Sequence, residues 1–192
     1  MTIKEIKKEI FDDFSKKNVQ SNYFQTSNYS TLMNNYKYDC LYIGAYKNNT
    51  LLGVSLILCK TIAPTIKYGY APRGFIIDYF DEDTLKQFTE ALKKFFASKN
   101  FAFIKINPEI IYSNINIKDK KKEVISQSKK LVSFMRSLGY EKLRNNLYFE
   151  SMLPKYNAII NLNEFDKSNV SKKCYVKSHS IINSSLEIKK GS

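Results

Sequence analysis

The chain has 192 residues, of which 43% are hydrophobic and 14% aromatic, and its formal net charge is +13 at pH 7. This length and apolar content exclude an intrinsically disordered chain and allow one domain with a hydrophobic core, or one domain and part of another. No apolar run reaches the ~18 residues of a transmembrane helix. Residues 1–17 contain no continuous apolar segment of a signal peptide, so we expect a cytoplasmic protein.

The positive charge is concentrated toward the C-terminus. Residues 1–117 hold 15 basic and 11 acidic side chains, whereas residues 118–192 hold 16 basic and 7 acidic ones. Such a field favours anionic partners, which include RNA, phosphorylated sugars and an acidic membrane surface. Lysine accounts for 28 of the 31 basic residues, so the composition of an AT-rich genome is an alternative source of the charge.

The first elements follow from hydrophobic periodicity. Residues 1–17 carry apolar side chains at helical spacing, which predicts a short amphipathic helix. Its predicted buried face consists of Ile3, Ile6, Ile10 and Phe14. A second helix is predicted over 28–35. Alternation then predicts a hairpin of strands 40–47 and 51–61.

A third strand is predicted over 66–70, followed by a helix over 83–99 capped by Asp83 and a strand over 101–106. A hairpin followed by strand, helix and strand predicts an α/β chain of the α+β kind with one mixed sheet. This order is similar to that of the GCN5-like (GNAT) acetyltransferase fold.

The C-terminal third is predicted to be mostly helical. A lysine-rich helix over 118–138 ends at Gly139, which suits the position just after a helix. Further elements are predicted beyond it, namely strands 147–150 and 156–162, a basic helix 166–185 and a strand 186–189.

The most informative stretch runs from Tyr70 to Asp78, with the sequence YAPRGFIID. Pro72 has a fixed φ, and Gly74 permits a tight or left-handed backbone. We therefore expect a rigid turn at the end of a strand, with Arg73 held on it. One cation and one carboxylate on such a turn suit an anionic or amine-bearing ligand. A plain connection in which Arg73 and Asp78 pair with each other is the alternative.

The pattern Tyr-x-Pro-Arg-Gly-x-x-x-Asp resembles the signature of the Fem (FemABX) family of peptidoglycan interpeptide-bridge aminoacyltransferases. Three weaker segments agree in order with that family, from about Gln20 onward. They are Phe24–Tyr29, Ile104–Glu109, and Leu138–Tyr140 followed by Leu153–Lys155.

The resemblance implies a GNAT-like acyltransferase fold in two lobes. Residues 1–153 would form the first lobe and residues 154–192 an incomplete start of the second. Because the substrate cleft of the family is shared between lobes, we expect little or no transfer by this chain alone.

The implied reaction transfers an amino acid from aminoacyl-tRNA to the stem-peptide amine of a UDP-linked or lipid-linked muropeptide precursor. The ester is already activated, so no cofactor or metal is required. Asp78 is the implied catalytic carboxylate near the acceptor amine. The implied substrate-binding residues are Tyr70, Arg73, Lys37 and Lys177. Tyr70 has aromatic packing as its alternative role.

Other chemistries fit the sequence less well. Cys40, Cys59 and Cys174 show no paired or zinc-ligand spacing, and Cys40 and Cys59 are expected to be buried thiols, while His179 is the only histidine. A histidine-dependent triad is therefore disfavoured. No glycine-rich loop of the kind that binds the CoA pyrophosphate is present, which disfavours acetylation from CoA.

Two other function classes stay open. One is a non-catalytic fragment that binds a cell-wall precursor or a partner protein, and the other is a basic RNA-binding module. The latter would need aromatic and basic side chains interleaved on one sheet face. Peripheral membrane association and self-association through the incomplete second lobe are further expectations.

Overall fold

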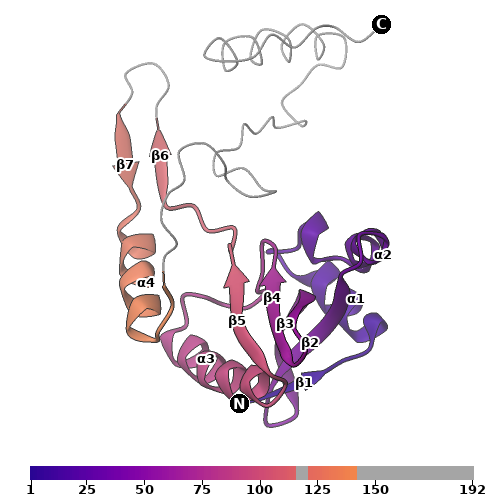
Figure 1. Cartoon of the computed structure of the whole chain (residues 1–192). Helices are drawn as coiled ribbons and strands as arrows, with labels where there is room; N and C mark the ends of the chain where they lie inside the picture. The colour runs from indigo at the N-terminus through magenta and orange to yellow at the C-terminus, as the bar shows by residue number, and fades with distance from the viewer. Residues whose placement is uncertain (116–120, 142–192) are drawn as a thin grey trace, which may run out of the picture. The chain divides into compact units, whose positions relative to one another are not determined.

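The computed structural model describes residues 1–115 and 121–141, and a five-stranded mixed sheet dominates this part of the chain. Its strands lie in the order in which they occur in the sequence (Figure 1). They are β1 (Thr2–Glu5), β2 (Asp39–Lys47), β3 (Thr50–Ala63), β4 (Ile66–Ala71) and β5 (Phe101–Ile106). Neighbouring strands are antiparallel except β4 and β5, which are parallel.

Helices cover both faces of the sheet (Figure 1). On one face, α1 (Lys8–Lys17) and α2 (Ser27–Asn35) enclose a core that contains Phe11, Leu56 and Tyr70. On the other face, α3 (Glu82–Ala97) and α4 (Ser126–Ser137) contribute to a core with Phe75 and Phe88. A 3₁₀ turn at Tyr23–Gln25 precedes α2.

The predicted hairpin–strand–helix–strand order is confirmed, with strand ends within about two residues of the expected ones. This part of the fold was accessible because each element has its own local pattern. The apolar run of β3 is buried on both faces, as a central strand requires. The helix packed on the sheet is α3, two residues shorter at its C-terminus than expected.

The expected N-terminal helix over 1–17 is wrong in its first third. Residues 2–5 form β1, which pairs with β2 in the register Thr2↔Tyr46 to Glu5↔Ile43. The free edge of β2 supplies a hydrogen-bond ladder that helical periodicity cannot reveal. The buried residues of α1 are Phe11 and Ser15, while Ile10 is exposed.

The expected helix over 118–138 begins later, at Ser126. Before it, β7 (Lys122–Val124) pairs with β6 (Ser113–Ile115) as a short antiparallel ladder. At the other end the expectation is confirmed, because Gly139 has φ +90° and the Tyr140 N–H donates to the Met135 carbonyl at 3.1 Å.

The cap of α3 is Asp81 rather than the expected Asp83. The Asp81 carboxylate accepts hydrogen bonds from the Thr84 N–H (3.1 Å) and the Thr84 hydroxyl (2.7 Å). Asp83 lies inside the first turn, where it contacts Lys47 and Gln87 on the surface. Both carboxylates are compatible with the positive end of the helix dipole, but only Asp81 satisfies a free backbone donor.

We expect Asp81→Ala to lower the melting temperature more than Asp83→Ala at neutral pH. Hydrogen bonds from Thr84 lower the pKa of Asp81. The contribution of the cap is therefore complete at neutral pH and is lost as the pH falls through that pKa. Thermal melts across an acid series should show the difference between wild type and Asp81→Ala shrinking. Equal decreases in melting temperature for the two substitutions at pH 7 would show that Asp81 stabilises the helix no more than Asp83 does.

The elements predicted after residue 141, and the predicted lobe boundary at 153/154, lie outside the described residues. Within residues 1–115 and 121–141, no helix is both long enough and apolar enough to span a bilayer.

Candidate active site

The segment from Tyr70 to Asp78 leaves the sheet and returns to it. β4 ends at Ala71, and the Gly74 N–H closes a turn onto the Ala71 carbonyl at 3.3 Å. The chain rejoins β3 at Ile76, which exchanges two backbone hydrogen bonds with Val54 (3.0 and 3.1 Å). Residues 72–75 therefore bulge away from β3 at the carboxyl end of β4, next to the parallel strand β5.

Gln25 fills the gap that this departure leaves in the ladder of β3. Its side-chain amide exchanges two hydrogen bonds with the backbone of Leu56, at 2.8 and 3.2 Å, as a paired strand residue would. The same amide nitrogen donates to the Pro72 carbonyl at 2.8 Å. The Gln25 side chain is completely buried, so it links the turn rigidly to the centre of the sheet.

Gly74 is required by the position of Gln25. A Cβ added at Gly74 would lie 2.8–2.9 Å from the Gln25 amide and 3.1 Å from the Ser55 hydroxyl oxygen. The left-handed residue of the turn is Arg73, with φ +52°, and not Gly74 as the sequence suggested. Gly74 thus leaves space for the Gln25 side chain rather than providing a left-handed backbone conformation.

The main chain of Arg73 is held from two sides. Its N–H donates to the Asn107 side-chain oxygen at 3.0 Å, and its carbonyl accepts from the Asn22 side-chain nitrogen at 3.3 Å. Asn107 follows β5, and Asn22 precedes the 3₁₀ turn. These contacts stabilise an arginine backbone conformation that is uncommon for a residue with a Cβ.

Tyr70 lies beneath this turn with 6% of its surface exposed. Burial, followed by the nearby Tyr29, raises the pKa of Tyr70 to about 12, while Arg73 and Asn107 act in the opposite direction. The hydroxyl therefore stays protonated at physiological pH. Among residues 1–115 and 121–141 it has no partner at hydrogen-bond geometry, although Asn107 is close enough to influence its pKa. Lys105 lies over the ring, 5.3 Å from its centroid.

The structure brings Tyr70 and Arg73 together, and Asp78 and Lys37 each lie in a local turn. Asp78 is exposed, and its carboxylate accepts a hydrogen bond from the Phe80 N–H at 2.9 Å. Lys37 has φ +60° and follows the C-cap of α2, and the next residue's N–H, that of Tyr38, donates to the Met33 carbonyl at 3.2 Å. Lys177 lies outside the described residues.

Three residues of this site were given no role by the sequence reasoning, namely Gln25, Asn22 and Asn107. Two of them lie in segments that resemble the Fem pattern, Gln25 in Phe24–Tyr29 and Asn107 in Ile104–Glu109. That resemblance pointed to these two segments, but it did not indicate which atoms Gln25 and Asn107 would contact. Asn22 had no signal, because its contact with the Arg73 carbonyl depends on how two distant segments meet.

The N-terminus of α3 is unsuited to a diphosphate. Its cap and first turn carry three successive carboxylates, Asp81, Glu82 and Asp83. An incoming phosphate would be repelled by them, and the Asp81 side chain already occupies the Thr84 N–H. This supports the inference that the chain does not use CoA in the manner of an acetyltransferase.

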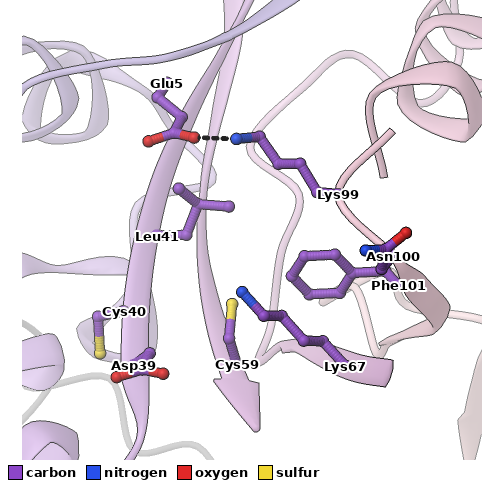
Figure 2. Close-up of a pocket in the computed structure, with 9 residues that line it drawn as sticks. All are labelled: Glu5, Asp39, Cys40, Leu41, Cys59, Lys67, Lys99, Asn100 and Phe101. Carbon is purple, nitrogen blue, oxygen red and sulfur yellow. Dashed lines mark ion pairs between the residues drawn. The ribbon is translucent and has the colours of Figure 1, made fainter. Parts of the chain in front are cut away.

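A cavity of about 400 Å³ lies around the starts of β4 and β5, away from the turn. Figure 2 shows Lys67, Phe101 and the Glu5–Lys99 ion pair around it. Two thiols also line this cavity. Burial raises the pKa of Cys40 to about 11 and that of Cys59 to about 12, so neither is a thiolate nucleophile at neutral pH. Cys59 is buried as expected, whereas Cys40 is only partly buried.

A model of the FemAB family matches residues 6–188. The chain belongs to the FemAB family. The suspected Fem relationship is thereby confirmed. A search of curated proteins found no match.

Solved structures give the fold of this FemAB family member. The crystal structure of FemX aligns with a TM-score of 0.54 and 18% identity, over 70% of this chain and 31% of the FemX chain. A V. cholerae integron cassette protein from the mobile metagenome is 15% identical over 78% of this chain and 90% of its own, with a TM-score of 0.45. A probable acetyltransferase is 10% identical over 82% and 100%, also with a TM-score of 0.45. The predicted mixed α/β fold is confirmed, and it is similar to the fold of FemX.

Proposed function

We propose that this chain is the precursor-binding lobe of an aminoacyltransferase that builds peptidoglycan interpeptide bridges. The donor would be aminoacyl-tRNA, and the acceptor the stem-peptide amine of a UDP-linked or lipid-linked muropeptide precursor. Family membership supports the reaction class. The single observation that carries the site is Arg73, whose main chain is held by Asn22 and Asn107 beside the buried hydroxyl of Tyr70.

The reaction needs positioning more than chemical activation. The amine nitrogen attacks the ester carbonyl, the bond from that carbon to the ribose oxygen breaks, and the proton that the amine loses passes by way of a base to the departing ribose oxygen. Asp78 is exposed and has a second carboxylate oxygen besides the one that receives the Phe80 N–H. We assign it the acceptance of that proton. Arg73 is assigned to the diphosphate or carboxylates of the precursor, and Lys37 and Lys177 to further precursor contacts.

Tyr70 is assigned an orienting role. Its pKa of about 12 keeps the hydroxyl neutral, so it can donate a hydrogen bond to an anionic oxygen held by Arg73. An arginine and a neutral donor side by side are suited to an oxyanion of the precursor. A ligand in this position would also satisfy a buried hydroxyl that has no partner in the described protein.

We expect Arg73→Ala to weaken binding of a UDP-linked muramoyl pentapeptide by about 10- to 150-fold, since a charge-assisted hydrogen bond contributes about 1.5–3 kcal/mol. Isothermal titration of the purified chain measures this directly. The matched control is Arg136→Ala, which removes the same charge from the last turn of α4 and should leave the affinity unchanged. Equal affinity of the wild type and Arg73→Ala would remove Arg73 from the site. A wild type that does not bind the precursor would refute the assignment of this lobe.

A further inference from the structure

Within residues 1–115 and 121–141, two buried side-chain oxygen atoms have no hydrogen-bond partner, and both belong to the Arg73 turn. They are the hydroxyl of Tyr70, beneath the turn, and Oδ1 of Asn22, whose amide nitrogen holds the Arg73 carbonyl. Buried polar groups of folded proteins are nearly always paired, so two such atoms at one turn indicate a ligand that supplies their partners. An anionic oxygen of the precursor is the proposed partner of Tyr70, whereas Asn22 Oδ1 still lacks one.

The orientation of the Asn22 amide follows from its two neighbours. Its nitrogen donates to the Gln20 carbonyl at 3.1 Å and to the Arg73 carbonyl at 3.3 Å. Carbonyl oxygens can only accept, so the amide nitrogen must face them and both of its hydrogens are used. The partner missing from Oδ1 is therefore a donor, an N–H or an O–H. Asn22 as a residue is partly exposed, so a ligand would reach Oδ1 after a side-chain rearrangement of the kind common at binding sites.

The segment that carries Asn22 contacts both ends of the loop between Arg73 and Asp78. The Asn22 side chain holds the Arg73 carbonyl, and the side-chain oxygen of Gln20 accepts a hydrogen bond from the Ile77 N–H at 3.0 Å. Ile77 directly precedes Asp78, the carboxylate assigned to take the proton of the acceptor amine. Residues 20–22 thus connect the arginine proposed to bind the anionic groups of the precursor with the proposed base.

We propose that Asn22 Oδ1 binds the acceptor amine of the precursor and orients it for attack, an inference that rests on the proposed function. One N–H of the amine points at Oδ1 while the nitrogen lone pair points at the ester carbonyl. An amide oxygen suits this role better than a carboxylate. A carboxylate in this position would raise the pKa of the amine and keep it protonated, and a protonated amine has no lone pair for the attack. Asn22 takes up no proton, so the base remains Asp78.

The test compares two UDP-linked pentapeptides by isothermal titration, one with lysine at the acceptor position and one with norleucine, which lacks only the amine. We expect Asn22→Ala to weaken binding of the lysine ligand about 10-fold more than binding of the norleucine ligand, as for loss of one hydrogen bond from a charged donor. Both ligands should also lose affinity because the Arg73 carbonyl loses its tether. This common loss cancels in the ratio of the two affinities.

The matched control is Asn107→Ala, which releases the Arg73 main chain from its other side, where the Asn107 oxygen accepts from the Arg73 N–H at 3.0 Å. It leaves Asn22 in place and should weaken both ligands by the same factor. Equal weakening of the two ligands by Asn22→Ala would overturn the proposal, because Asn22 would then act only through Arg73.

Asn22→Asp provides a second variant. It keeps an oxygen acceptor at this position but has no amide nitrogen to donate to the Arg73 carbonyl. We therefore expect it to bind both ligands less tightly than the wild type and still to prefer the lysine ligand, by at least the wild-type ratio. Loss of that preference in Asn22→Asp would contradict the proposal.

The wild type alone separates this inference from the proposed function, whether or not the variants fold. It should bind the lysine ligand about 10-fold more tightly than the norleucine ligand. Equal binding of the two ligands would overturn the amine site and leave the precursor-binding lobe standing. Binding of neither ligand would refute the proposed function, and the amine site with it.

Discussion

Replacement of Gln25 by leucine is expected to lower the free energy of unfolding by about 3–5 kcal/mol. The substitution removes hydrogen bonds to the Leu56 N–H, the Leu56 carbonyl and the Pro72 carbonyl, all at a fully buried position. Each unsatisfied buried backbone group costs about 1–3 kcal/mol. Urea denaturation of the wild type and the variant measures the change.

The matched control is Gln87→Leu. Gln87 lies on α3, and its amide makes one surface hydrogen bond, to Asp83 at 2.7 Å, so the change should stay within about 0.5 kcal/mol. If Gln25→Leu also stays within 1 kcal/mol, the amide is not a structural part of the sheet. Precursor binding by a folded Gln25 variant should fall as well, because the Pro72 carbonyl loses its tether next to Arg73.

Gly74→Ala is expected to destabilise the protein by about 2–3 kcal/mol, although alanine is the smallest side chain that can be added. Its Cβ would lie 2.8–2.9 Å from the Gln25 amide, which cannot move without breaking its hydrogen bonds. Overpacking of a tightly filled interior typically costs about 1–3 kcal/mol. Chemical denaturation again provides the measurement.

A double-mutant cycle identifies the cause. With alanine at residue 25 the clash disappears, so adding Gly74→Ala to Gln25→Ala should cost less than about 0.5 kcal/mol. The coupling between the two sites should therefore amount to roughly 1.5–3 kcal/mol. Strict additivity would mean that the glycine is needed for its backbone conformation and not for the space occupied by Gln25.

The part of the fold that was predictable from the sequence is the part with local signals. β2, β3, β4, α3 and β5 each carry a period, a turn or a cap within their own residues. β1 does not, since residues 2–5 become a strand only because β2 offers a free edge. The apolar residues Ile3 and Ile6 fit a helical period equally well, so the sequence favoured the wrong element there.

The sequence predicted the turn of the candidate site, but not the contacts that hold this turn in place. Pro72 and Gly74 correctly indicated that Arg73 would be fixed at the end of β4. They did not indicate that Arg73 would take the left-handed conformation, or that the glycine accommodates a glutamine 49 positions earlier in the chain. Such roles arise from contacts between segments far apart in sequence, and no local pattern encodes them.

The hydrogen bonds that Gln25 makes with Leu56 and Pro72 also affect the expected order of folding. Its hydrogen bonds join residues 31 and 47 positions apart, while the hairpins of the central sheet close over only a few residues. Contacts that close long loops form late, because their entropic cost must be met before they stabilise the chain. The hairpins of β2, β3 and β4 are therefore expected to form first, with the Arg73 turn still unanchored. Docking of the segment around Gln25 would then be a late step that gives the turn its binding shape.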